Sequence, residues 1–312
     1  MSNRTTSGAA LAAAPTLPSP EPAATPRRFT VPRVALGEVL GVAPFVIFAL
    51  MFLILPTIYL IVAAFTDSSG GFTLQNIRDL GTDRVVNAFD ASLRLSIVTA
   101  VLGAFFGLLI CIAIIRGGLP RGLRGITMTF SGVASNFAGV PLAFAFLATF
   151  GRLGIVTLIF KLVGIDLYRS GFNILSFWGV VATYLYFQIP LMVLIIAPAV
   201  DGLRKEWNEA AATLGATPWQ FWRHVGLPVL WPNLLGTLSL LFANAFGAIA
   251  TAYSLVGSGL NIVPILLFSQ MRGDVLHNPG LGAALALAMV VVTGIANVIY
   301  LIVRARAERW LK

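Results

Sequence analysis

Charged side chains are concentrated in one internal stretch of a chain that is otherwise strongly apolar. Between residues 201 and 228 the charged side chains are Asp201, Arg204, Lys205, Glu206, Glu209 and Arg223. Long uncharged runs lie on either side of this stretch. So many ionised groups are too costly to leave in hydrocarbon. The chemistry open to them is ion pairing and hydrogen bonding at a surface.

Catalytic and metal-binding patterns are missing from the sequence. His224 and His277 have no His, Cys or carboxylate partner at metal-ligand spacing. No Ser, His or carboxylate positions pair convincingly, and no carboxylate or Lys lies deep in an apolar run. The single Cys111 lies in such a run and is expected to be a small buried hydrophobe. We therefore expect no catalytic residue, no metal site and no cofactor bound by this chain.

Local signals predict that 201–228 form two short helices. Asp201 is a plausible N-cap for a first helix over 203–214, and Gly215 stands where a left-handed residue would end it. Thr217 can cap a second helix, with Pro218 at its first position and Gln220 completing a capping box.

The end of the second helix is expected near Leu227–Pro228. Pro228 has no amide hydrogen to donate, and it restricts the backbone of Leu227. The two helices would then form a bent helical element at the membrane surface.

Composition identifies an integral membrane protein. The 312 residues are 58% hydrophobic and 11% charged, with a mean hydropathy of +0.89. Soluble domains carry about a quarter charged residues. The net charge of +9 comes from residues scattered at the ends of apolar segments, without the basic stripe and interleaved aromatics of a nucleic-acid surface. Nucleic-acid binding is therefore not expected.

Apolar runs long enough to cross a bilayer predict an all-α membrane protein with six transmembrane helices. The expected spans are 39–65, 95–115, 125–151, 170–200, one within 223–272, and 281–303. A single span in 223–272 follows from the break at Gly257-Ser258-Gly259 and from the positive-inside tendency. The N- and C-termini and 201–228 are then cytoplasmic.

Two other segments complete the expected organisation. Residues 1–33, rich in Ala, Pro, Ser and Thr, are expected to be a disordered cytoplasmic tail, and 34–312 to be the membrane domain. The short apolar stretch 153–165 is expected to lie on the outer face or to pack against the third span.

Polar positions within the apolar spans are candidates for a translocation path. They are Asn136, Gln188, Asn244, Thr251 and Tyr253. Such residues equally serve as interhelical hydrogen bonds, which is the more common role of any single one. Gly132, Gly139 and Pro141 indicate close packing or a kink in the third span.

The spaced pattern in 201–228 resembles a known family. Glu209-Ala210-Ala211, Gly215 four residues later, and Leu227-Pro228 are similar to the EAA loop of permease subunits of bacterial ABC importers. The resemblance covers about 91–304 and implies a type I ABC importer permease fold. The chain lacks the Walker A pattern that binds ATP. The resemblance therefore implies that a partner ATPase uses ATP and Mg.

In that family the loop docks on the ATPase as a coupling helix. The resemblance gives Glu209 a carboxylate role toward the partner, and it gives Ala210, Ala211 and Ala212 a face for close approach. Gly215 would permit the bend, with Leu227 and Pro228 completing the motif. The alternative for Glu209 is a solvated ion pair with Lys205 one turn earlier.

The resemblance also implies the rest of the assembly. An ATPase dimer, a second permease subunit (commonly in a heterodimer) and a periplasmic or lipid-anchored substrate-binding protein would join this chain in the bacterial inner membrane. Residues 246–289 look most like spermidine/putrescine-type and 2-aminoethylphosphonate-type permeases. A self-contained secondary transporter and a membrane-embedded enzyme remain the alternatives.

Overall fold

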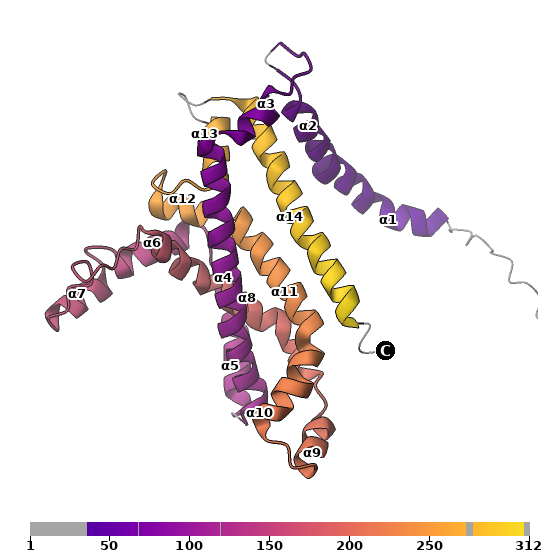
Figure 1. The fold of residues 1–312 in the computed structure, drawn as a ribbon, viewed down its shortest axis with the longest axis vertical. Helices are drawn as coiled ribbons and strands as arrows, with labels where there is room; N and C mark the ends of the chain where they lie inside the picture. The colour runs from indigo at the N-terminus through magenta and orange to yellow at the C-terminus, as the bar shows by residue number, and fades with distance from the viewer. Residues whose placement is uncertain (1–35, 68, 119, 273–276, 309–312) are drawn as a thin grey trace, which may run out of the picture. The chain divides into compact units, whose positions relative to one another are not determined.

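The computed structural model describes residues 36–308 except 68, 119 and 273–276 (Figure 1). The chain divides into two compact units, Met1–Met51 and Phe52–Lys312. The predicted disordered tail, residues 1–33, lies outside the described residues.

The described chain is almost entirely helical. The first unit contains α1 (Leu36–Ala49), and the π-helix η1 (Leu50–Ile54) follows it in the sequence. The second unit contains α2 (Leu55–Ala64), α3 (Gln75–Arg78), η2 (Asp79–Gly81), α4 (Asp83–Arg116), α5 (Arg121–Asn136), α6 (Val140–Phe150), α7 (Ile155–Leu162), α8 (Phe177–Asp201), α9 (Lys205–Thr213), α10 (Pro218–Phe221), η3 (Trp222–Gly226), α11 (Leu227–Gly247), α12 (Ala250–Val256), α13 (Val263–Arg272) and α14 (Pro279–Glu308). Within the described residues, extended pairing is limited to one bridge between Thr66 and Phe72.

Six described helical segments are long and apolar enough to cross a membrane, as predicted. They are Gly41–Ala64, Asp83–Arg116, Val140–Leu162, Phe177–Asp201, Pro218–Gly247 and Pro279–Arg306. The region 223–272 contributes to one of them, because α12 and α13 are too short to span. Gly257, with φ +58°, follows the end of α12 at the predicted break.

Small residues on α4 bring it close to α8 at the centre of the second unit. A Cβ added at Gly107 would lie 2.5 Å from the Met192 Cβ, and one at Gly103 would lie 3.0 Å from the Gln188 Cβ. Such close approach is how membrane helices associate without a hydrophobic driving force. α11 packs against both helices, and α14 packs against α2 and α11.

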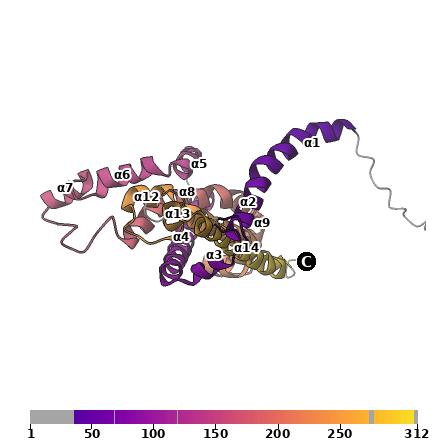
Figure 2. The ribbon, with the colours of Figure 1, turned by 90° about the horizontal axis from the view of Figure 1, so that it is seen from above.

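The third predicted span, 125–151, is wrong as a single helix. The chain breaks between α5 and α6, where Gly139 has φ +75°, and α6 leaves in a different direction (Figure 2). α5 contains Arg, Thr, Ser and Gly, and the apolar candidate is instead Val140–Leu162. This candidate includes α7, the predicted short helix at 153–165. The kink indicated by Gly139 and Pro141 is confirmed as a break.

Pro228 does not end a helix, so this prediction was also wrong. α10, η3 and α11 follow one another without a gap. Within the wide turn of η3, the Leu227 N–H donates to the carbonyl of Trp222, five residues earlier. A π-turn relaxes the backbone around a residue that lacks an amide hydrogen and whose ring crowds the preceding turn. Pro228 then lies in the first turn of α11.

Candidate functional site

The first helix of the polar stretch ends in a Schellman motif. The Gly215 N–H donates to the Ala212 carbonyl at 2.9 Å, and the Ala216 N–H donates to the Ala211 carbonyl at 2.9 Å. Gly215 has φ +79°, a conformation open to glycine without strain. The predicted role of Gly215 as the left-handed end of the helix is confirmed.

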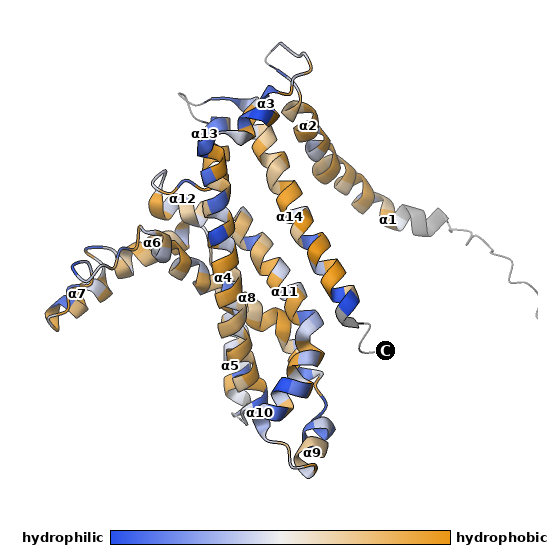
Figure 3. Cartoon of the chain, viewed as in Figure 1, coloured by the Kyte–Doolittle hydropathy of each residue, from blue (hydrophilic) through white to orange (hydrophobic). Residues whose placement is uncertain are grey.

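The second helix begins with the predicted capping box. The Thr217 hydroxyl accepts from the Gln220 N–H at 3.3 Å, while the Gln220 side chain accepts from the Thr217 N–H at 2.7 Å. Pro218 occupies the first turn. These two caps fix the turn between α9 and α10. Hydrophilic residues lie on either side of this turn, on part of α9 and around α10 (Figure 3). We call 205–228 the coupling element.

Asp201 is not an N-cap, contrary to the prediction. Arg204 occupies that position without a side-chain cap, while Asp201 ends α8 and pairs with Arg124 at 2.6 Å. The neighbouring Arg116 donates from Nη2 to the Leu203 carbonyl at 2.5 Å. The Leu203 side chain is 3% exposed within an apolar cluster. Two arginines and one buried leucine therefore hold the start of the coupling element.

The Glu209 side chain is exposed and takes part in no ion pair of the described residues. The ion pairs among those residues are Arg94–Asp90, Arg124–Asp201 and Arg169–Asp166. The alternative pairing with Lys205 is therefore absent. Ala210 and Ala212 are exposed as well, while Ala211 is partly buried. Leu227 is partly buried and Pro228 exposed. The motif thus presents a free carboxylate on a smooth, small-residue surface.

A shallow apolar groove runs beside these alanines. Its volume is about 350 Å³, and it is lined by Trp207, Ala210, Ala211, Leu214, Val225 and Val229. Leu214 is 88% exposed, a high value for a leucine at the tip of a charged element. A contiguous exposed apolar surface beside charged residues is a candidate for an interaction site.

Two of the predicted path residues are buried in helix packing. Gln188 is fully buried, and its Nε2 donates to the Leu241 carbonyl at 2.9 Å, which joins α8 to α11. Thr251 is 2% exposed, and its hydroxyl accepts from the Gly139 N–H at 2.7 Å. Both therefore serve as interhelical hydrogen bonds.

The other three path residues are exposed. Asn136 lies at the end of α5, where its Nδ2 donates to the Gly132 carbonyl at 2.9 Å. Asn244 is exposed on α11, and Tyr253 is 43% exposed on α12 with its ring 5.1 Å from that of Phe268. Of the three, only Asn244 lies in a candidate span, where a polar group is costly against lipid.

The sequence did not show that two helix breaks are tied together. The Gly139 N–H, at the break before α6, donates to the Thr251 hydroxyl in α12. The Ala248 carbonyl, at the break after α11, accepts a hydrogen bond from the Tyr184 hydroxyl. The Gly-Val-Pro run at 139–141 signalled the first break, whereas no local signal marked Tyr184.

A metal site requires several ligating side chains close together. The described residues contain no group of three or more His, Cys, Asp or Glu side chains that could hold a metal ion. The arrangement is suited to docking and to transmitting movement.

Known proteins resemble this chain in sequence. The molybdenum transport system permease protein ModB of Mycobacterium bovis is 29% identical over 184 residues, which are 58% of this chain and 64% of ModB. A probable sulfate transport system permease protein, cysT of Marchantia polymorpha, is 26% identical over 60% of this chain and 64% of its own length. These two matches span a little under two thirds of the relatives. The putrescine transport system permease protein PotI of Escherichia coli is 24% identical over 83% of this chain and 88% of PotI.

The fold matches that of solved transporters. A chain of a bacterial ABC transporter involved in the import of the acidic polysaccharide alginate superposes with a TM-score of 0.67 at 18% identity, covering 88% of this chain and 95% of that one. The model of the family "binding-protein-dependent transport system inner membrane component" matches residues 37–309. The chain is a member of this family of inner-membrane transport components.

Proposed function

We propose that this chain is the membrane-spanning permease subunit of an ATP-driven ABC importer. The observation that supports this most directly is the coupling element: a doubly capped pair of helices with an exposed Glu209, joined without a gap to a spanning helix. Family membership supports the class of protein, and the geometry supports a route by which movement of the coupling element reaches the spanning helix α11.

The coupling element is built to pass on displacement. The Schellman motif and the capping box satisfy the backbone of the turn, so α9 and α10 move together. α10 continues through η3 into α11, so a push on Glu209 is delivered to the spanning helix. A partner ATPase that closes on ATP and Mg would supply that push and tilt the helix.

We place the coupling element and both termini in the cytoplasm. Arg116 and Arg124 contact Leu203 and Asp201, just before the element, so basic residues lie on its side of the membrane. Cytoplasmic loops carry an excess of Lys and Arg. The chain would then be a multi-pass protein of the bacterial inner membrane.

A second permease subunit would complete the pathway. The exposed Asn136, Asn244 and Tyr253 occupy spans or segments next to spans, where lipid does not satisfy polar groups. A facing subunit, in a homodimer or a heterodimer, would enclose these side chains in a polar route. A periplasmic or lipid-anchored binding protein would deliver the solute to that route. One solved relative was crystallised with such a partner, an alginate pentasaccharide-bound periplasmic protein.

For the cargo we favour a polyamine over an oxyanion or a 2-aminoethylphosphonate. PotI aligns over 83% of the chain, against 58% for ModB. The names of ModB, cysT and PotI refer to molybdenum, sulfate and putrescine, so phosphonate transport has no support from these relatives.

Reconstitution tests the proposal. The chain would be co-expressed with its neighbouring permease, ATPase and binding-protein genes, purified, and placed in proteoliposomes. We expect uptake of radiolabelled putrescine that requires ATP and the ATPase, and uptake of molybdate or sulfate instead would contradict the proposed cargo. Uptake by this chain alone, driven by an ion gradient, would instead identify a secondary transporter. Substrate turnover without transport would identify a membrane enzyme.

A further inference from the structure

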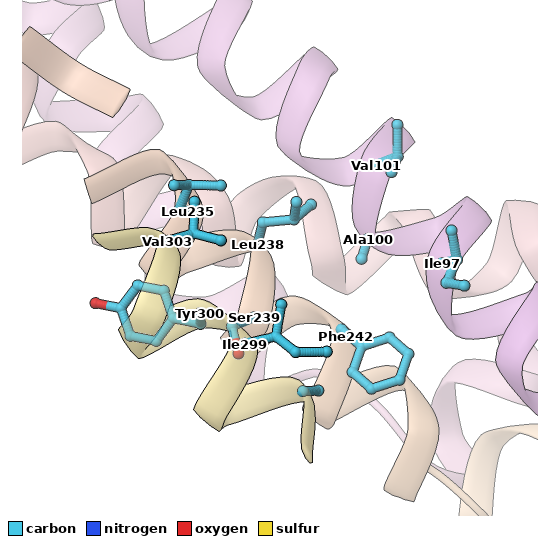
Figure 4. A pocket seen from close by; sticks show the side chains of 11 residues that line it. Ile97, Ala100, Val101, Leu235, Leu238, Ser239, Phe242, Ile299, Tyr300 and Val303 are labelled. Atoms are coloured by element: carbon cyan, nitrogen blue, oxygen red, sulfur yellow. The ribbon is translucent and has the colours of Figure 1, made fainter. Parts of the chain in front are cut away.

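An apolar groove runs between α4, α11 and α14 (Figure 4). Its cavity volume is about 210 Å³. Its lining consists of Ile97, Ala100, Val101, Leu235, Leu238, Ser239, Phe242, Ala296, Ile299, Tyr300 and Val303. Only Ser239 and Tyr300 carry polar atoms in their side chains, so the groove suits a hydrocarbon occupant.

Small side chains create the groove. Ala100, Ser239 and Ala296 come from three different helices and leave the space that larger residues would fill. On one side Tyr300 approaches α11 closely, because a Cβ added at Gly236 would lie 2.9 Å from the Tyr300 hydroxyl. This contact fixes α14 against α11 and keeps the groove open beyond it.

The groove lies within the candidate spans, since all its lining residues belong to them. The contact between Tyr300 and Gly236 brings the C-terminal half of α14 to the middle of α11. From Ala296 to Val303 the helix rises about 10 Å, which is most of a half-bilayer core of about 15 Å.

A cationic group follows the groove at its end. Arg304 comes directly after the lining residue Val303, and its Nη1 donates to the Tyr300 hydroxyl at 3.0 Å. A guanidinium has five donors in a planar fork that matches phosphate oxygens. The groove therefore combines an apolar slot with a guanidinium next to one of its ends, bonded to the hydroxyl of Tyr300.

We propose that this groove binds one anionic phospholipid of the leaflet next to the coupling element. An acyl chain would occupy the slot, and the headgroup phosphate would contact Arg304. A helix of another protein is a poorer fit, because 10 Å of helix with its side chains fills roughly 900 Å³. An uncharged occupant would make no use of the arginine.

Native mass spectrometry of the purified full-length chain tests the proposal. The chain would be delipidated and titrated with 1-palmitoyl-2-oleoyl-phosphatidylglycerol or with the matching phosphatidylcholine. We expect one phosphatidylglycerol per chain, bound more tightly than phosphatidylcholine. Arg304→Gln should lower the affinity for phosphatidylglycerol about fivefold and remove the preference. Arg306→Gln, on the same helix outside the lining, should change neither the affinity for phosphatidylglycerol nor the preference over phosphatidylcholine.

Variants that fill the slot with a larger side chain distinguish a lipid bound in the groove from lipid that coats the protein surface non-specifically. Ala296→Phe on α14 and Ser239→Leu on α11 both add bulk to the lining and should each lower phosphatidylglycerol binding at least tenfold. Ile295→Phe, at a position 53% exposed and outside the lining, is the matched control. Thermal unfolding of each variant would show that it remains folded.

Three results would overturn the proposal. The first is equal binding of the two lipids by the wild-type chain. The second is undiminished binding by both slot-filling variants. The third is a photo-crosslinker at Val303 that captures a protein, whether a second copy or another subunit, in place of lipid.

Discussion

Arg124 and Asp201 join the first turn of α5 to the last residue of α8, with 2.6 Å between Nη2 and Oδ2. They are 77 residues apart in the chain. Their side chains are 46% and 38% exposed, so water screens the pair. The contact lies directly before Leu203, the buried residue that leads into α9, and it therefore braces the start of the coupling element.

Breaking this ion pair should cost little stability. Arg124→Gln and Asp201→Asn should each lower the free energy of unfolding by less than about 1 kcal/mol, because the pair is part-exposed. A double-mutant cycle by thermal unfolding in detergent would measure the coupling energy between the two side chains. The charge-swapped chain, Arg124→Asp with Asp201→Arg, should recover part of the loss. A coupling energy of zero would show that the contact is incidental.

Reversing the charge of Glu209 should abolish ATP-driven uptake while leaving membrane insertion intact. Glu209 is exposed and is in none of the ion pairs of the described residues, so Glu209→Lys removes a docking group without disturbing the fold. Uptake and co-purification of the ATPase would both be measured. Glu206→Lys makes the same charge change one turn earlier on α9 and is the control. Equal loss in both variants would point to net charge and not to the position of Glu209.

Replacing Gly215 should uncouple the element through its backbone. A left-handed conformation costs a residue with a Cβ roughly 1–2 kcal/mol. A Cβ at Gly215 would meet nothing within 4 Å, so any effect of Gly215→Ala is conformational and not steric.

We expect reduced uptake for Gly215→Ala, complete loss for Gly215→Pro, and milder loss for Gly215→Asn, since asparagine tolerates this conformation better. The same order should appear in substrate-stimulated ATPase activity of the assembled transporter. Parental activity in all three variants would contradict a role for this turn.

Features governed by neighbouring residues were predictable from the sequence. Gly215 and the Thr217–Gln220 capping box follow from rules that act within a few residues, and both appear in the structure. The number of candidate spans followed from composition and length.

Features set by distant partners were not predictable. Asp201 looks like an N-cap in isolation, but Arg124 reaches it from another helix. Pro228 looks like a helix end, but the π-turn at η3 carries the helix past it. Exposure of Asn136 and burial of Gln188 likewise depend on which helices pack together, which the sequence alone does not state.

Asp67 should make the loop after α2 sensitive to acid. Its Oδ1 accepts from the Ser69 hydroxyl at 2.6 Å and from the Gly71 N–H at 2.9 Å, and these bonds lower the pKa of the carboxyl below its ordinary 3.8. Because the folded pKa is depressed, the stabilisation is complete above the unfolded pKa and is lost as pH falls through the folded pKa.

Hydrogen exchange would detect this loss. Protection of the Gly71 amide, corrected for intrinsic exchange, should be constant from pH 7 to 5 and fall below pH 4. In Asp67→Asn the acid-dependent change should disappear. An unchanged profile in Asp67→Asn would assign the acid sensitivity to another group.

The bond between Thr251 and Gly139 should hold the two helix breaks in register. The Thr251 hydroxyl is buried and accepts from the Gly139 N–H at 2.7 Å, across 112 residues of sequence. Thr251→Val keeps the shape but leaves a partly buried amide without its acceptor, which costs about 1 kcal/mol. The melting temperature in detergent should fall by a few degrees. Thr251→Ser retains the acceptor and should preserve most of the stability.

Transport measurements extend the test of this bond. If the breaks before α6 and after α11 move as one body, Thr251→Val should reduce the uptake per folded molecule as well as the amount of folded protein. Thr251→Ser should transport like the parent, because the hydroxyl oxygen stays within reach of the Gly139 N–H. Full transport by Thr251→Val at a temperature where it is folded would mean that the two breaks act independently. The coupling element would then drive α11 without passing motion to α6.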